Sequence, residues 1–319
     1  MPVFAVLKMK NKYAFYQAAF FCAALLLSGC GDKPAAEPGM VIIPAGEFTI
    51  GSNKADDENM QKAYGFTDPL FVDEHPLHKV SVPGFLIDQY EVTNAQYKAF
   101  VRATQHGEPE AWVQNGYNVR DEKLRSFKVD FLRKIASDYF KLDRDTATMS
   151  REELLQELGK IQASRDNQPV TSVSWQDAHA YCIWVKKRLP HEVEWEIAAR
   201  GAQAWEYPWG NEFDLKKTNS GKDRDQENPM AAVGTFPADQ SPYAVYDMAG
   251  NVSEWVDDWY QAYPGADYHS PYFGQIQKVV RGGSAGAGHY SLSFFFRAAL
   301  RAHLPPDAVS DDLGFRCAK

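Results

Sequence analysis

The stretch from Arg281 to Arg301, RGGSAGAGHYSLSFFFRAALR, carries imidazole, hydroxyl and guanidinium groups but no cysteine. Its double glycine predicts a tight turn, and the apolar residues that follow predict a strand. Because side chains alternate along a strand, Ser291, Ser293 and Arg297 would share one face. Such a groove lining suits a carboxylate, a sugar or a peptide. The candidate ligand-binding residues are His289, Ser291, Ser293, Arg297 and Arg301.

A structural interpretation of the same stretch is equally open. Arg297 and Arg301 would then pair with internal acids, and the serines would be packing residues. A serine nucleophile is not favoured, because nothing in the sequence ties a histidine to one of these serines. His75 and His78 lack a recognisable third metal ligand.

The N-terminal segment has the composition of an export signal. Three lysines precede the apolar run 13–29, which is too short for a comfortable membrane span. The residues Leu-Ser-Gly-Cys at its end resemble a bacterial lipobox. We therefore expect a lipoprotein signal peptide at 1–29, acylation of Cys30 and a flexible Pro/Ala tether at 30–39. An ordinary secretory signal or a membrane anchor is the alternative.

These features predict a periplasmic protein attached to a membrane through Cys30. Gly31, rather than an aspartate, follows the cysteine and favours the outer membrane over the inner one. The formal net charge of −8 argues against a nucleic-acid partner, which needs a basic face.

Cysteine usage is informative once the signal is set aside. Of the four cysteines, Cys22 would leave with the signal and Cys30 would carry lipid. Cys182 and Cys317 remain in an oxidising compartment, where they form either a bridge or two buried thiols.

Strand and helix signals divide the rest of the chain. Strand pairs are expected at 40–51 and 79–89, and a helix begins at Asn94 after the capping Thr93. Residues 105–168 differ in composition and predict a helical insertion. Its expected helices are 121–142 and about 150–162, the second opened by a capping box. Two further helices are expected at 174–187 and 191–200, with little regular structure after them.

Seven motifs occur in order between residues 40 and 319. They are VIIPAGEFTIGS, GFLIDQYEVTNAQYKAFV, PVTSVSWQDAHAYCIWVKKRLPHEVEWEIAARG, YPWGN, AVYDMAGNVSEWVDDWY, VVRGGS and DLGFRCAK. Together they resemble the formylglycine-generating enzyme family, the sulfatase-modifying factors. The resemblance implies one α+β domain at 40–319, low in regular secondary structure and related to C-type lectins. It also implies a disulfide between Cys182 and Cys317.

The resemblance further implies structural calcium. Calcium prefers oxygen ligands, which carboxylates and loop carbonyls supply. The positions that match the family's first site are Asp247, Gly250, Val252 and Glu254. Those that match a second site, across a loop of different length, are Asn219, Ser220, Asp225 and Glu227.

The catalytic cysteines of the family are missing. In active members two thiols on the strand after GGS hold copper(I), and here they would fall near Ala287 or Gly288 and at Ser293. Copper(I) is soft and selects sulfur, so a serine hydroxyl does not replace a thiolate. We therefore expect no copper and no generation of formylglycine on sulfatases by the known mechanism.

The sequence leaves open whether the chain is an enzyme, and it favours a pseudoenzyme. The expected function is that of a non-catalytic binding, regulatory or accessory module in the cell envelope, for example beside a secretion or signalling system. Its partner would be an envelope protein or a glycan. The alternative is a periplasmic maturation enzyme of altered chemistry, with its site in the groove after GGS.

Overall fold

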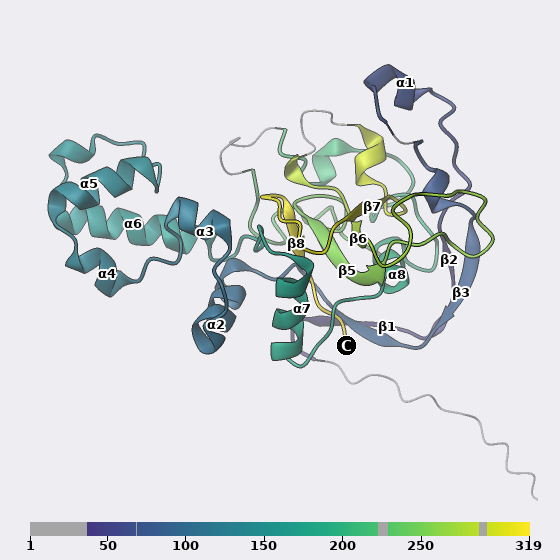
Figure 1. Ribbon diagram of the computed structural model, residues 1–319, viewed down its shortest axis with the longest axis horizontal. Coiled ribbons are helices and arrows are strands. Elements are labelled where there is room, and N and C mark those ends of the chain that lie inside the picture. Colours follow the sequence, from purple (N-terminus) through teal and green to yellow (C-terminus); the bar gives the residue numbers. More distant parts are fainter. Residues whose placement is uncertain (1–36, 68, 223–228, 287–291) are drawn as a thin grey trace, which may run out of the picture. The chain divides into compact units, whose positions relative to one another are not determined.

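The structure is a computed structural model that describes residues 37–67, 69–222, 229–286 and 292–319. Helices and short strands are mixed along the chain, as expected for an α+β domain (Figure 1). The expected signal peptide 1–29, the acylated Cys30 and the tether up to residue 36 lie outside the described residues.

The first four strands form two separate antiparallel pairs. β1 (Met40–Ile43) pairs with β4 (Phe85–Asp88), and β2 (Gly46–Ile50) pairs with β3 (His78–Val82). The strands expected at 40–51 and 79–89 are therefore present, but neighbours in the chain do not pair with each other. Apolar side chains from three of these strands enter one core; they are Ile43, Phe48, Ile50, Phe85 and Ile87.

A four-stranded sheet holds the C-terminal half together. Its order is β7-β6-β5-β8, and only the pairing of β5 with β8 is parallel. The strands are β5 (Ser253–Trp259), β6 (Lys278–Arg281), β7 (Arg301–Leu304) and β8 (Leu313–Phe315). β5 lies between β6 and β8, and Ser284 of the GGS turn after β6 donates to Asp312, just before β8, at 2.6 Å.

Three capped helices pack on this framework. α2 (Asn94–Thr104) and α7 (Trp175–Trp184) each begin with a full capping box, which satisfies the first backbone donors. α8 (Glu192–Arg200) ends at Gly201, whose φ of 67° and closeness to Pro242 leave no room for a side chain. The helices expected at these places are confirmed, and α7 and α8 contact β5 (Figure 1).

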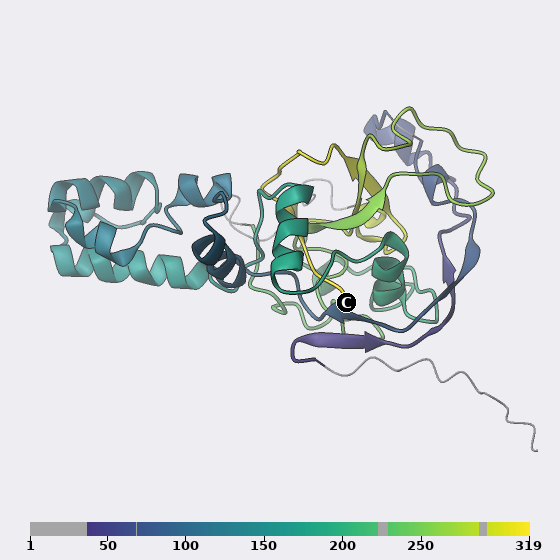
Figure 2. The same cartoon turned by 60° about the horizontal axis from the view of Figure 1, so that its bottom comes forward.

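The segment 105–168 is helical and has a small core of its own. Its elements are α3 (Glu110–Asn115), α4 (Asp121–Ser126), α5 (Val129–Asp138), the 3-10 turn η2 (Thr146–Thr148) and α6 (Arg151–Arg165). Figure 2 shows α5 and α6 side by side. Leu132 and Leu158 are fully buried between the helices.

The single helix expected at 121–142 is wrong, because the chain is extended at Phe127 and Lys128. Arg151 at the start of α6 explains the break. Its guanidinium donates to the carbonyl oxygens of Arg125 and Phe127, which a continuous helix would have used internally. Phe131, in the first turn of α5, is 46% exposed.

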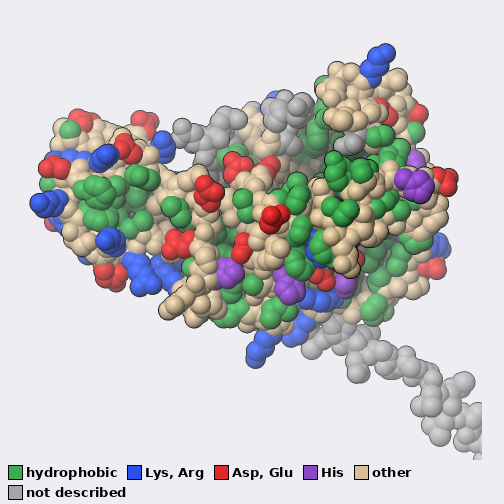
Figure 3. All heavy atoms as spheres, in the orientation of Figure 1, with side chains coloured by type: hydrophobic (Ala, Val, Ile, Leu, Met, Phe, Trp, Pro, Cys, Tyr) green, Lys and Arg blue, Asp and Glu red, His purple; other side chains and the backbone are tan. Residues whose placement is uncertain are grey.

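The remaining elements are short. They are α1 (Met60–Tyr64) and the 3-10 turns η1 (Val72–Glu74), η3 (Leu215–Lys217) and η5 (Ser293–Phe296). Among the described residues, no helix is both long and apolar enough to cross a membrane. On the face drawn in Figure 3, lysine and arginine side chains are interspersed with acidic ones.

Candidate functional site

The turn that opens the candidate groove is built from two glycines. Gly282 has a φ of 78°, in the left-handed region that favours glycine. A Cβ on Gly283 would lie 2.5 Å from the carbonyl oxygen of Phe295 and 2.6 Å from that of Ala249. The loop that follows contains His289 and Ser291, as well as the expected thiol positions at Ala287 and Gly288, and it lies outside the described residues.

Ser293 does not lie on a strand. Residues 293–296 form the 3-10 turn η5, so the expected alternation of Ser291, Ser293 and Arg297 on one strand face is wrong. A 3-10 turn repeats every three residues and brings Phe294 and Arg297 to the same side. Both side chains approach Phe71, Phe294 edge-on at 5.1 Å and Arg297 at 4.8 Å from the ring centre.

Arg297 is a core residue that pairs with two acids. Its side chain is 1% exposed, and it donates from Nη1 to Glu74 at 2.5 Å and from Nε to Glu206 at 2.5 Å. Lys54 reaches the same oxygen of Glu206 at 3.0 Å. The Nη2 atom of Arg297 is buried without a partner among the described residues.

The electrostatics of this cluster favour the charged forms of Arg297 and Glu206. Burial lowers the pKa of Arg297, but Glu74 and Glu206 outweigh it and the net pKa is raised. Burial raises the pKa of Glu206, but Arg297 and Lys54 outweigh it and the net pKa is lowered. Burial raises the pKa of Glu74, and Arg297 offsets this only in part.

Arg301 is equally internal. It binds Glu192 with two nitrogens, at 2.7 and 2.9 Å, and also donates to the carbonyl oxygens of Asp73 and Gln261. The ring of Tyr263 lies 4.0 Å from its guanidinium carbon. The structure thus supports the structural interpretation of Arg297 and Arg301: both pair with internal acids.

The described residues do not fit copper(I). Ser293 offers a hard hydroxyl oxygen where the family has a thiol, and Cys182 and Cys317 are joined in a disulfide. No step of chemistry through copper follows from this donor set.

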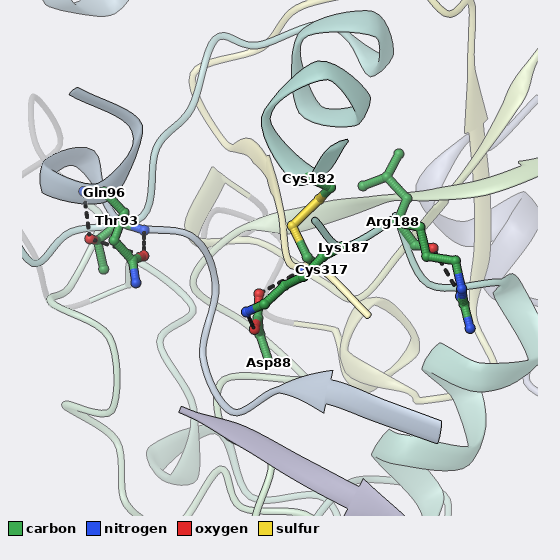
Figure 4. The surroundings of a disulfide bond; sticks show 8 residues. Asp88, Thr93, Gln96, Cys182, Lys187, Arg188 and Cys317 are labelled. Atoms are coloured by element: carbon green, nitrogen blue, oxygen red, sulfur yellow. Dashed lines mark hydrogen bonds and ion pairs between the residues drawn. A yellow bond between two sulfur atoms is a disulfide. The ribbon is translucent and has the colours of Figure 1, made fainter. Parts of the chain in front are cut away.

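The disulfide implied by the resemblance is present. Cys182 on α7 is bonded to Cys317, with the two Cα atoms 5.7 Å apart. Asp88 accepts a hydrogen bond from the backbone nitrogen of Cys317 at 3.0 Å and forms an ion pair with Lys187 at 2.5 Å (Figure 4). The C-terminus is thereby fixed to both α7 and β4.

Glu254, in the first expected calcium loop, accepts hydrogen bonds from other side chains. Its side chain is buried and receives Nε and Nη2 of Arg316 at 2.7 and 2.6 Å. Trp195 donates to it as well, at 2.9 Å. A carboxylate has about four acceptor sites, so these three donors leave one for a cation, and Glu254 stays a predicted calcium ligand.

Asp247 fits a cation better. It is buried, and its Oδ2 accepts from the backbone nitrogen of Gly234 at 2.6 Å. Burial raises the pKa of Asp247. The pKa of Glu91 is raised well above its usual range, first by burial and then by the charge of Asp247. Its Oε2 atom has no hydrogen-bond partner among the described residues. Among the described residues, Arg316 is the cation that opposes these buried carboxylates, so a calcium ion at Asp247 would relieve the excess negative charge.

The second expected loop lies against the first. Oδ1 of Asn251 accepts from Nδ2 of Asn219 at 2.9 Å and from the nitrogen of Ala231 at 2.9 Å, and its own amide donates to Glu91 at 3.0 Å. Asn219 and Ser220 are buried, whereas Asp225 and Glu227 lie outside the described residues. Sequence reasoning missed Asn251 and Glu91, although both occur within quoted motifs.

The histidines serve separate contacts. His75 meets the carbonyl oxygen of Lys54 at 2.5 Å, and His78 meets that of Pro76 at 2.8 Å. His106 pairs with Asp177 at 2.7 Å. Within the described parts of the chain, no three His, Cys, Asp or Glu residues gather closely enough to hold a metal ion.

Comparison with known proteins settles the family. A family model described as the sulfatase-modifying factor enzyme 1-like domain matches residues 30–319. The chain belongs to this family. The thiol positions, the disulfide and the two loops of this chain can therefore be compared with those of the sulfatase-modifying factors.

Relatives named as enzymes and relatives named as inactive are both similar to this chain. A protein named inactive C-alpha-formylglycine-generating enzyme 2 from Bos taurus is 35% identical over 291 residues, covering 88% of this chain and 87% of the relative. A formylglycine-generating enzyme from Streptomyces coelicolor is 34% identical over 311 residues, covering 93% and 94%. The family thus includes members named as enzymes and members named as inactive.

A solved structure confirms the fold alone. PvdO from Pseudomonas aeruginosa superimposes with a TM-score of 0.56 at 24% identity, covering 89% of this chain and 99% of PvdO. The α+β fold expected from the resemblance is therefore confirmed.

Proposed function

We propose that this chain is a non-catalytic binding or regulatory module of the cell envelope, anchored to the outer membrane by a lipid on Cys30. The observation that carries the proposal is the state of its cysteines. The two that would remain after signal cleavage, Cys182 and Cys317, are joined to each other. No thiol is left for copper(I), and the position of one catalytic thiol is Ser293.

The described residues form a stable scaffold on which a recognition surface can be built. The disulfide fixes the C-terminus, and the candidate arginines pair inside the core. We propose that a calcium ion bound at Asp247, with the carbonyls of Gly250 and Val252, stabilises the loops of the same scaffold. The partner that fits an envelope lipoprotein is another envelope protein or a glycan.

The proposal is tested by photo-crosslinking in cells that express the full chain. A photoreactive residue replaces Ser293 on η5, the exposed Val113 in the helical insertion or, as a control, the exposed Lys79 on β3. We expect one discrete envelope protein to be captured from Ser293 or Val113 and not from Lys79.

The result also separates the competing interpretations. Capture from Val113 alone would assign binding to the insertion, and capture from Ser293 alone would assign it to the region around η5. No discrete protein product from either position would contradict a protein-binding module. A screen of metabolites and metals for the alternative, a maturation enzyme of altered chemistry, would then follow.

A further inference from the structure

A cavity of about 520 Å³ lies between the helical insertion and the rest of the domain. Its wall is contributed by the start of α2, by α3, by the segment after α5 and by the end of α6. This volume is within the range of small-molecule sites in proteins, about 300–1,000 Å³. Residues on its wall include Asn94, Trp112, Tyr139, Lys141, Arg165 and Asp311.

Arg165 on this wall differs from the buried arginines of the domain. Arg281, Arg297, Arg301 and Arg316 each pair with at least one carboxylate. Arg165 is half-buried, and within the described ranges it forms no ion pair; its Nη1 donates to the carbonyl oxygen of Asn115 at 2.9 Å.

An unpaired cation in this position is costly. Burial lowers the pKa of Arg165, and no acid among the described residues offsets this effect. The net charge of the chain is −8, so acids are plentiful, yet no described acid pairs with this guanidinium. A partly desolvated guanidinium gains most from an anion that it can bind with two nitrogens.

The wall around Arg165 is held in place by hydrogen bonds. Asn94 donates from Nδ2 to the carbonyl oxygen of Arg165 at 3.0 Å and accepts from Nε1 of Trp112 at 2.7 Å. Both side chains are buried. The backbone that carries Arg165 is thereby fixed against α2 and α3, so the site is formed before a ligand arrives.

A second cation and one acid complete the charged wall. Lys141 is exposed and has no ion pair in the part of the chain that the structure describes. Asp311 is also exposed, and water screens it more than the half-buried Arg165. Tyr139, which is 48% exposed, adds a hydroxyl group to the same wall.

We propose that this cavity binds a small ligand through a carboxylate, with Arg165 as the anchoring residue and Lys141 as a supporting charge. The ligand is an acidic sugar or a short peptide with a free C-terminal carboxylate. The inference concerns the cavity alone and does not depend on the lipid anchor or on catalysis.

Calorimetric titration of the detergent-solubilised full chain tests the proposal with paired probes. Galacturonate is compared with galactose, and dialanine with its C-terminal amide. One acid is expected to bind, while its neutral counterpart does not. Binding of galacturonate would identify a sugar ligand, and binding of dialanine a peptide.

Variants assign the site. Arg165→Gln should weaken binding of that acid about tenfold, since a charge-assisted hydrogen bond is lost. Arg144→Gln removes an exposed arginine of the same insertion that does not line the cavity, and it should leave the affinity unchanged. Lys141→Gln, at an exposed position, should weaken binding about threefold, and it serves if Arg165→Gln fails to fold.

Three results would overturn the proposal. The first is that neither acid binds. The second is that a neutral counterpart binds as tightly as its acid. The third is that the folded Arg165→Gln variant, or Lys141→Gln if that variant does not fold, retains the affinity of the unaltered chain.

Discussion

Arg297 shows how a residue type typical of ligand binding can instead belong to the core. Its spacing from Ser293 suggested a polar strand face, but the chain turns at η5 and carries the guanidinium inward to Glu74 and Glu206. The acids that receive it are 223 and 91 residues away in sequence, so no local pattern could have paired them.

Breaking this buried pair should destabilise the domain. Glu74→Gln leaves Arg297 with one acid fewer, and we expect a loss of about 3–5 kcal/mol in the free energy of unfolding. Urea denaturation measures it. The control is Glu47→Gln, whose pair with Lys79 is exposed and should matter little. Equal effects of the two substitutions would show that the Arg297 cluster adds no stability.

Glu206 gives a pH dependence with a defined sign. The unfolded carboxyl titrates near its ordinary pKa of 4.5, and the folded one titrates below it because of Arg297 and Lys54. The stability from this group is complete above pH 4.5 and is lost as the pH falls through the folded pKa.

Unfolding titrations at several pH values check this. The difference in unfolding free energy between the natural chain and Glu206→Gln should be largest at neutral pH and shrink below pH 4.5. A difference that grows on acidification would contradict the lowered pKa of Glu206.

At the scale of elements, the disulfide joins α7 to the last segment of the chain across 135 residues. A loop of that length predicts a contribution of about 4–5 kcal/mol in the chain-entropy account. The double substitution Cys182→Ser and Cys317→Ser should lower the free energy of unfolding by that order. Urea denaturation under non-reducing conditions measures it, and unchanged stability would contradict the structural role.

The loop at Asp247 makes a separate prediction. If calcium binds there, adding calcium to the chelator-treated protein should raise its melting temperature, and Asp247→Asn should abolish that rise. Asp311→Asn, an exposed acid outside the loop, is the matched control and should keep it. A rise that persists in Asp247→Asn would exclude this loop as the site.

How well elements could be predicted depends on how local their signals are. The starts of α6 and α7 were predictable because Ser150 and Ser174 cap their own helices. The break between α4 and α5 was not, since Arg151 binds carbonyls 24 and 26 residues earlier. The prediction of a groove after GGS was wrong in part for the same reason. The acids that pair with Arg297 and Arg301 lie far away in the sequence.

At the scale of the whole molecule, the proposed anchor is testable independently of the fold. Cells expressing the full chain and fed a labelled fatty acid should label it, and Cys30→Ala should lose the label and leave the membrane fraction. Cys22→Ala, within the same N-terminal segment, is the control and should keep both. Label on Cys30→Ala would contradict acylation at that cysteine.

We propose that this member of the sulfatase-modifying factor family does not generate formylglycine. The most direct measurement incubates the purified chain with a cysteine-containing sulfatase peptide, copper and oxygen, and follows the peptide by mass spectrometry. The Streptomyces coelicolor enzyme serves as the positive control. We predict that the cysteine stays a thiol with this chain and becomes an aldehyde with the control. Formation of the aldehyde by this chain would contradict the proposed loss of this activity.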